Sequence, residues 1–198
     1  MLFTPFRLNT GLTLKNRLVV APMTTYSSYE DGTVRETEPP YLRRRAEGGF
    51  GLVMTAACYI HPTGQAFDGQ WGCERDDRHP SLKSMADAIH EGGAAAFLQI
   101  HHGGRMCPSR LCGRVLSASA VPATRPGAET PEAMSEDEIW TMIEGYAQAA
   151  RRAVEAGYDG VEIHGANTYL IQQFVSPHSN RRDDEWGQDR LKFSREVT

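Results

Sequence analysis

Residues 161–170 read Val-Glu-Ile-His-Gly-Ala-Asn-Thr-Tyr-Leu, and this stretch joins a strand to a cluster of reactive side chains. Val161 and Ile163 alternate with polar neighbours, which predicts a short buried strand. An imidazole, a carboxamide and a phenol follow, at His164, Asn167 and Tyr169. The first two can donate hydrogen bonds to one oxygen, and the phenol has a proton to give. This combination favours the reduction of a polarised double bond, whereas the alternative is a core histidine beside a packing aromatic.

Three similar strand–helix units precede this stretch. Strands are predicted over residues 17–21, 51–59, 95–101 and 160–163. Helices are predicted over residues 39–48 and 80–91, from 136 to the capping glycine at 157, and from about 189 to the end. Residues 135–138 (Ser-Glu-Asp-Glu) form a capping box that opens the third helix. Its predicted apolar stripe consists of Ile139, Ile143, Ala147, Ala150 and Val154.

The alternation of strands and helices predicts an α/β fold with parallel strands and right-handed crossovers. Long polar segments follow the carboxyl ends of the strands, as they do at the active-site face of a (β/α)8 TIM barrel. Such a barrel needs roughly 200 to 400 residues. Residues 1–198 are therefore interpreted as the N-terminal half of a barrel, the first four units, with the C-terminal half absent. A doubly wound sheet is disfavoured, because residues 21–24 (Ala-Pro-Met-Thr) do not provide a G-x-G-x-x-G turn.

Composition excludes several other classes. The net charge is −4, and the one basic run, residues 43–45, is interpreted as a solvated helix face, so nucleic acid is not an expected partner. No stretch approaches the roughly 18 apolar residues that cross a bilayer, and the N-terminus lacks a signal peptide, which predicts a cytoplasmic protein. The four cysteines have no C-x-x-C spacing, so free thiols and no metal site are expected.

Several motifs together resemble the old yellow enzyme family, NADH:flavin oxidoreductases that bind FMN on a TIM barrel. They occur in the order of that family and cover nearly the whole chain. The matching segments are residues 14–17, 21–24, 98–105, 156–164, 169–174, 176–177 and 180–187.

The resemblance implies a flavin site made by residues that end the first three strands. Pro22, Met23 and Thr24 are expected against the flavin ring, with the Thr24 hydroxyl near its pyrimidine edge. Ala57 is expected beneath the ring. The Gln99 amide suits the donor and acceptor atoms of the pyrimidine. The alternative for Thr24 and Gln99 is simple capping of strand ends.

The resemblance also implies the chemistry. His164 and Asn167 are expected to hold the carbonyl or nitro oxygen of an activated alkene. Hydride passes from the reduced flavin to the β-carbon, Tyr169 gives a proton to the α-carbon, and NADH or NADPH supplies the electrons. Tyr26 is expected to help bind this small-molecule substrate.

The chain departs from the family pattern in two places. Residues 187–190 (Gly-Gln-Asp-Arg) are shorter than the corresponding family segment, which leaves the start of the last helix open. The arginine near the flavin N1 edge and the FMN phosphate loops belong to later strands, outside these residues. A polypeptide that ends at Thr198 is therefore expected to retain FMN weakly.

Two alternatives stay open. A metal hydrolase would use His101, His102 and His164, but adjacent side chains on a strand point to opposite faces, which argues against it. A non-catalytic half-barrel would leave its first and fourth strands as open edges. Such edges predict a homo-oligomer or association with a separate C-terminal piece.

Overall fold

The computed structural model describes residues 1–198, which form two compact units. The first unit comprises Met1–Cys58, Gly69–Gln99 and Ala150–Glu162, and the second comprises Tyr59–Asp68, Ile100–Ala149 and Ile163–Thr198. The chain passes from one unit to the other within four elements. These are β5 (Cys58–Tyr59), β6 (Ala95–His101), α4 (Glu136–Glu155) and β9 (Gly160–Ile163).

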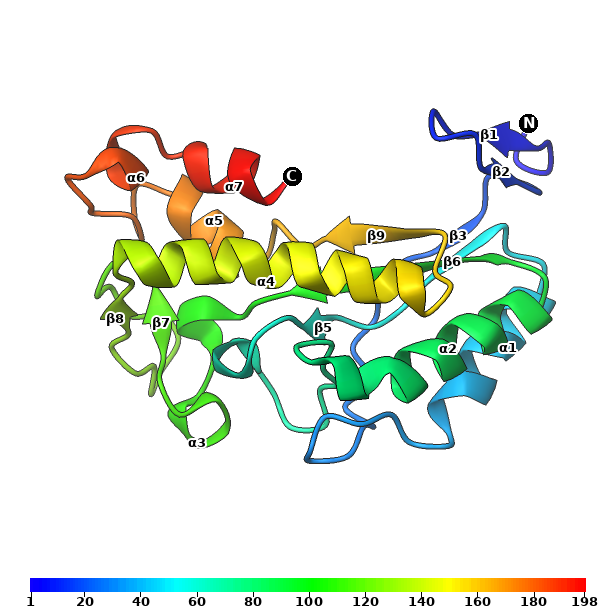
Figure 1. Cartoon of the computed structure of the whole chain (residues 1–198), viewed down its shortest axis with the longest axis horizontal. Coiled ribbons are helices and arrows are strands. Elements are labelled where there is room, and N and C mark those ends of the chain that lie inside the picture. Colours follow the sequence, from blue (N-terminus) through cyan, green and yellow to red (C-terminus); the bar gives the residue numbers. More distant parts are fainter. The chain divides into compact units, whose positions relative to one another are not determined.

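The remaining elements belong to one unit or the other and are labelled in Figure 1 where there is room. The other strands are β1 (Phe6–Arg7), β2 (Thr13–Leu14), β3 (Val19–Val20), β4 (Leu52–Met54), β7 (Leu116–Ser117) and β8 (Glu132–Ala133). The other α-helices are α1 (Glu38–Glu47), α2 (His79–Glu91), α3 (Ser109–Cys112), α5 (Leu170–Val175), α6 (Glu185–Gln188) and α7 (Lys192–Val197). Short 3-10 helices are η1 (Pro62–Gly64), η2 (Asp76–Arg78) and η3 (Gly104–Met106).

A parallel sheet forms the centre of the first unit. Strand β3 pairs with β4, and β4 pairs with β6, with Val53 opposite Ala96 in the register. Strand β9 pairs with β6 on its other edge, because the Ala96 carbonyl accepts from Asp159 N–H (2.9 Å) while the next carbonyl, Phe97, accepts from Thr55 N–H (3.0 Å). These parallel strands with their connecting helices confirm the predicted α/β class.

The predicted strand 51–59 is interrupted, and this expectation was wrong in detail. Residues 55–57 belong to neither β4 nor β5, and the Thr55 N–H makes the last backbone hydrogen bond to β6 before the break. The carbonyls of Ala56 and Ala57 accept hydrogen bonds from the side chains of Trp71 and Gln70 instead, each at 3.1 Å. Buried backbone groups need partners, and here side chains from a following loop replace the strand ladder.

Helices α1 and α2 lie side by side in the first unit (Figure 1). Prolines 39 and 40 are tolerated in the first turn of α1, because that turn has no internal N–H partners. The buried residues of α2 are Leu82, Met85, Ala86, Ala88 and Ile89, which confirms its predicted apolar face. Gly92 permits the close approach, since a Cβ there would lie 2.5 Å from that of Ala46.

The capping box of α4 is confirmed, but its predicted apolar stripe was wrong. Glu138 N–H donates to the Ser135 hydroxyl (3.2 Å), and Ser135 N–H donates to the Glu138 carboxylate (2.9 Å). Of the predicted stripe only Ile139 is buried, and Val154 is 70% exposed. The other buried side chains of α4 are Met142, Tyr146, Ala149 and Ala153. A neighbouring stripe with the larger Met142 and Tyr146 side chains is buried instead.

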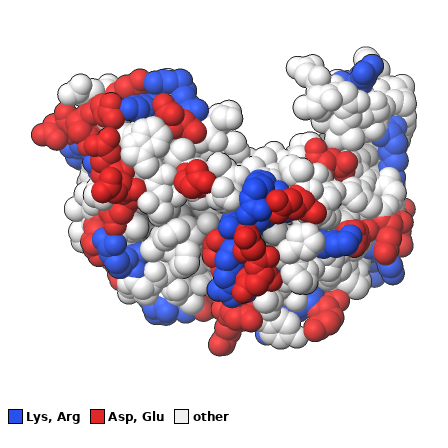
Figure 2. Space-filling model, in the orientation of Figure 1, with Lys and Arg blue, Asp and Glu red and all other residues white.

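Charges of both signs are interspersed on the exposed face of α4 (Figure 2). Arg151 and Arg152 both contact Asp76 at 2.7 Å, and Arg151 also contacts Glu155 at 2.7 Å. The basic run at 43–45 is likewise solvated, with Arg43 paired to Glu91. No helix is long and apolar enough to cross a membrane.

The excursion between β6 and α4 contains structure that the sequence did not predict. Strands β7 and β8 pair in parallel, with Leu116 opposite Glu132. Two short helices, α5 and α6, follow β9, and the last helix begins at Lys192 rather than near Asp189. Phe174 and Phe193 stack with ring centroids 4.2 Å apart, so α7 is held against α5. All four cysteines are free and buried.

Candidate active site

Three aromatic side chains of the predicted reactive stretch and of β6 gather in the second unit. The ring centroids of His164 and Tyr169 lie 4.9 Å apart, edge to face. His101, at the end of β6, contacts both, with centroids 4.3 Å from Tyr169 and 5.3 Å from His164. The proposed hydrogen-bond donor to the substrate oxygen, His164, and the proposed proton donor, Tyr169, are therefore neighbours. His101 is a third member, which the sequence indicated only as a possible metal ligand.

Local hydrogen bonds define the proton position on His164. Its backbone N–H donates to the Ile100 carbonyl (3.0 Å), which extends the pairing of β9 with β6. Its Nδ1 accepts from the Ala166 backbone N–H (3.3 Å), so that nitrogen carries a lone pair. The proton of a neutral ring is then on Nε2, which is the form needed to donate to a substrate oxygen.

The backbone between His164 and Tyr169 has an unusual conformation. Asn167 and Thr168 have φ values of +55° and +64°, in the left-handed region that favours glycine. Thr168 is β-branched, so this conformation is costly there and persists only when the surroundings enforce it. Asn167 itself is exposed. Strain of this kind concentrates at functional sites.

His101 and His102 differ sharply although they are adjacent. Burial holds the pKa of His101 well below its usual range, and the neighbouring His164 and His102 lower it further, so His101 is neutral at pH 7. His102 points elsewhere, with Nδ1 accepting from Gly104 N–H (3.0 Å) and Nε2 3.1 Å from the Thr63 hydroxyl. Burial, with a smaller effect of His61, lowers the pKa of His102 to about 3.

This divergence argues against the metal-hydrolase alternative. The side chains of His101 and His102 do not converge, as expected for adjacent residues on a strand. The structure contains no group of three or more His, Cys, Asp or Glu side chains that could hold a metal ion. His102 is a buried structural histidine with both ring nitrogens engaged.

Gln99 is the best-defined residue of the predicted flavin site, which lies in the first unit. Its Nε2 donates to Glu162 Oε1 (2.6 Å), and its backbone N–H donates to the Thr55 hydroxyl (3.3 Å). A carboxylate only accepts, so the amide nitrogen must face Glu162. The Gln99 Oε1 atom then accepts no hydrogen bond from the protein, although the residue is only 7% exposed. An acceptor in this state fits the pyrimidine N3–H of a flavin.

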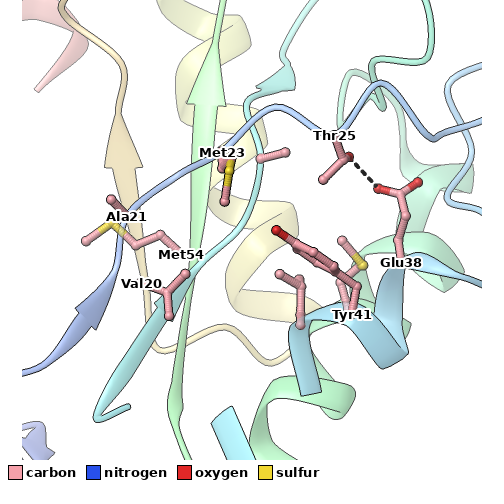
Figure 3. Close-up of a pocket in the computed structure, with 10 residues that line it drawn as sticks. Val20, Ala21, Met23, Thr25, Glu38, Tyr41 and Met54 are labelled. Carbon is pink, nitrogen blue, oxygen red and sulfur yellow. Dashed lines mark hydrogen bonds between the residues drawn. The ribbon is translucent and has the colours of Figure 1, made fainter. Parts of the chain in front are cut away.

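Met23 and Thr24 border an open cleft of about 420 Å³ that also includes Thr25, Ser27 and Tyr41. Next to it, an apolar cavity lies between β3, β4 and α1, with Met23 and Tyr41 pointing into it (Figure 3). That cavity offers only about 10 Å³ to a water-sized probe, so it is too small for a ligand. Thr25 donates to Glu38 at its rim (3.4 Å).

The predicted site residues fall into two groups. Pro22, Met23, Thr24, Tyr26, Ala57 and Gln99 belong to the first unit, and His164, Asn167 and Tyr169 belong to the second. Ala57 is buried, and Tyr26 is 66% exposed with a φ of +53°. Sequence reasoning missed Glu162 and considered His101 only as a metal ligand, although strand periodicity could have placed both at this site. Glu162 is two residues before His164, and His101 is two residues after Gln99, so each pair shares one face of its strand.

The family profile of the NADH:flavin oxidoreductase / NADH oxidase family matches residues 1–198. The chain belongs to this family. Its members use FMN with a nicotinamide electron donor, the cofactors that the sequence indicated. The parallel α/β sheet is that of part of a TIM barrel, because old yellow enzyme structures match over the chain.

Individual relatives show how far the likeness extends. The chain is 50% identical to NADH:fumarate oxidoreductase of Klebsiella pneumoniae over 94% of its length, but over only 20% of that protein. It is 46% identical to a probable NADH-dependent flavin oxidoreductase, YqiG, of Bacillus subtilis over 97% of its length and 52% of that protein. An old yellow enzyme homologue of Zymomonas mobilis superposes with a TM-score of 0.92 at 33% identity, covering 100% of this chain and 58% of that one. The chain thus spans from a fifth to about three-fifths of these flavin oxidoreductases.

Proposed function

We propose that this chain carries the flavin-ring and substrate side of an FMN-dependent reductase of activated C=C bonds. It would form the first four βα units of a (β/α)8 barrel, with residues 1–198 as its N-terminal half. Its substrates would be α,β-unsaturated carbonyl-type compounds, and NADH or NADPH would be the electron donor. The predicted cytoplasmic location belongs to this proposal.

One observation supports it above the others. Strand β6 has Gln99 and, two residues later, His101, while Glu162 on β9 is followed two residues later by His164. Because alternate residues share one face of a strand, each strand presents an acceptor-bearing group and then a histidine on the same face. Paired strands with this pattern would place a flavin pyrimidine beside Gln99 and a substrate beyond it.

FMN would supply the hydride once a nicotinamide has reduced it. The residues of this chain would do the rest. Gln99 Oε1 would accept from the pyrimidine N3–H, Pro22, Met23 and Thr24 would contact the ring, and Ala57 would leave room beneath it.

At the substrate, His164 Nε2–H and the Asn167 amide would donate to the carbonyl oxygen, where negative charge develops as the β-carbon is reduced. The Tyr169 hydroxyl would give its proton to the α-carbon. Tyr26 would help bind the substrate.

The test uses the longest polypeptide that carries residues 1–198, titrated with FMN. The proposal predicts that anaerobic NADH or NADPH bleaches the bound flavin. An enone, an enal or a nitroalkene should then restore the oxidised spectrum and yield a saturated product by mass spectrometry. A protein that binds no FMN, or whose reduced flavin none of these acceptors reoxidises, would contradict the proposal.

A second candidate is a flavin module that oxidises NADH and passes the electrons to another part of a larger protein. It is favoured by the relatives named for fumarate and acrylate, of which the chain covers only 20% and 18%. This module would bleach with NADH yet transfer electrons to no alkene. A third candidate is a non-catalytic half-barrel that associates with itself or with a separate C-terminal piece. The molecular mass in solution would distinguish it by revealing a homo-oligomer or a bound partner.

A further inference from the structure

Gln173 of α5 is a buried side chain, 1% exposed, whose amide makes every hydrogen bond it can. Its Nε2 donates to the carbonyls of Thr168 (2.6 Å) and Gly103 (3.1 Å). Its Oε1 accepts from the Arg105 backbone N–H (3.0 Å) and from the Ser117 hydroxyl (3.0 Å). A carboxamide has two donor hydrogens and two acceptor lone pairs, so its capacity is filled.

The four partners come from three separate segments of the second unit. Gly103 and Arg105 follow β6, Ser117 lies on β7, and Thr168 belongs to the loop 164–169. The backbone N–H of Gln173 also donates to the Tyr169 carbonyl (2.9 Å). One residue therefore joins the loop that holds the candidate catalytic side chains to two neighbouring segments.

The orientation of this amide is fixed by its partners. Two of them are carbonyls, which only accept, and one is a backbone N–H, which only donates. Rotation of the amide by half a turn would bring acceptor against acceptor. Gly104 makes room for it, because a Cβ at that position would collide with the Gln173 amide, and its φ of +59° is one that glycine tolerates.

The contact with Thr168 falls where the backbone is least favourable. The φ of Thr168 is +64°. Its N–H donates to the side chain of Gln172, and its carbonyl accepts from Gln173. Two consecutive glutamines thus hold both sides of one strained residue, directly before Tyr169. Surroundings of this kind are what such a conformation requires.

We propose that Gln173 is a positioning residue for the reaction, which holds Thr168 in the left-handed conformation and thereby sets where Tyr169 presents its proton. The role assigned to Tyr169 rests on the proposed function. The effect on the loop does not, because the hydrogen bonds exist within this chain alone.

The test compares Gln173→Met, which keeps the length of the side chain and removes all four hydrogen bonds, with Gln173→Glu. A protonated glutamic acid has one O–H donor for the two carbonyls, whereas an ionised carboxylate has no donor for either of them. Burial raises the pKa of a carboxyl group, so the neutral form should persist well above its usual range. Ser117→Ala removes one of the four hydrogen bonds and leaves Gln173 itself in place, so it gives a second measurement if Gln173→Met fails to fold. Gln188→Glu, at an exposed residue of α6, is the matched control.

Two measurements are made on each FMN-loaded variant. Amide hydrogen exchange over residues 166–170 reports the loop, and rapid mixing reports flavin reduction by NADH and reoxidation by an enone separately. In Gln173→Met the amides of Thr168 and Tyr169 should exchange about two- to tenfold faster, the range that corresponds to one hydrogen bond of ordinary net strength. Reoxidation should slow by a similar factor while reduction by NADH stays unchanged.

The pH dependence sharpens the assignment. In Gln173→Glu, loop amide exchange and flavin reoxidation should resemble those of wild type at low pH and those of Gln173→Met at high pH. Ser117→Ala should change both rates less than Gln173→Met does at every pH. If the amides of Thr168 and Tyr169 exchange in Gln173→Met at the wild-type rate, the proposal is overturned. Fast exchange with unchanged reoxidation would instead show that the loop is held by Gln173 but that Tyr169 is not the proton donor, which counts against the proposed function alone.

Discussion

The flavin-edge residues of the first unit and the loop 164–169 of the second are built in different ways. Gln99 and Glu162 lie on strands, have ordinary backbone conformations and hold each other by a 2.6 Å hydrogen bond. The loop has two consecutive non-glycine residues with positive φ, and a buried amide from the next helix holds it. Under the proposed function, the difference means that cofactor binding uses regular strands, whereas substrate chemistry uses groups that regular structure does not bring together.

The largest expected effect belongs to the loop, at Tyr169. Tyr169→Phe removes the proton donor, and general acid groups contribute about 10²–10⁴-fold. We expect reoxidation of the reduced flavin by an enone to slow within this range, while reduction by NADH and FMN affinity stay unchanged. Tyr29→Phe, at an exposed tyrosine of the first unit, is the control. Equal reoxidation rates in Tyr169→Phe and wild type would show that the Tyr169 phenol is not the proton donor.

His164 should rank next. Loss of one donor to a developing oxyanion costs about 2.7–4 kcal/mol, or roughly 10²–10³-fold in rate. We expect His164→Ala to slow enone reduction by this factor without changing the midpoint for unfolding by more than a surface substitution does. His178→Ala, at an exposed histidine of the same unit, provides the comparison. A variant that loses FMN as well as activity would show that the two regions are not separable in this way.

The buried His102 should affect stability rather than catalysis. The folded-state pKa of His102 is about 3, below the roughly 6.5 of an unfolded histidine, so unfolding takes up a proton between these values. This contribution to stability is present above pH 6.5 and is lost as the pH falls toward 3. Its slope approaches about 1.4 kcal/mol per pH unit for one group. Denaturant unfolding at pH 7 and pH 4.5 should show a weaker pH dependence in His102→Gln than in wild type, and an identical dependence would contradict the assignment.

The smallest expected effect lies in the first unit, at Glu162. Glu162→Gln removes a negative charge and the constraint that turns Gln99 Oε1 away from it. We expect FMN to bind about two- to tenfold more weakly, the range for one hydrogen bond of net 0.5–1.5 kcal/mol. The flavin midpoint potential should rise, because a nearby carboxylate disfavours the added negative charge of the reduced form. Fluorescence titration and dye equilibration measure the two quantities. If FMN affinity and the flavin midpoint potential are both unchanged, Glu162 does not act on the flavin site.

Some of this architecture could be predicted from the sequence. Strands β6 and β9 begin and end at the predicted residues, because glycines and polar residues bound their apolar runs. The apolar stripe of α4 could not be chosen correctly, since two overlapping stripes have similar composition and only packing decides between them. The pairing of β7 with β8 joins two-residue strands across a long loop, and so short a pattern has no periodicity to detect.

The same distinction applies to the site. His164, Asn167 and Tyr169 were found because they are close in sequence, and the contact of His164 with Tyr169 agrees with that prediction. The links from Gln99 to Glu162 and from Gln173 to Thr168, Gly103 and Ser117 connect segments up to 70 residues apart. Only the fold determines which acceptor each of these two glutamines faces.

The most direct test of the account is the reoxidation of NADH-reduced, FMN-loaded protein by an enone, measured by anaerobic rapid mixing in wild type and His164→Ala. The account predicts that both proteins bleach with NADH at the same rate and that the variant reoxidises at least about a hundredfold more slowly. Equal reoxidation rates in the two proteins would contradict it.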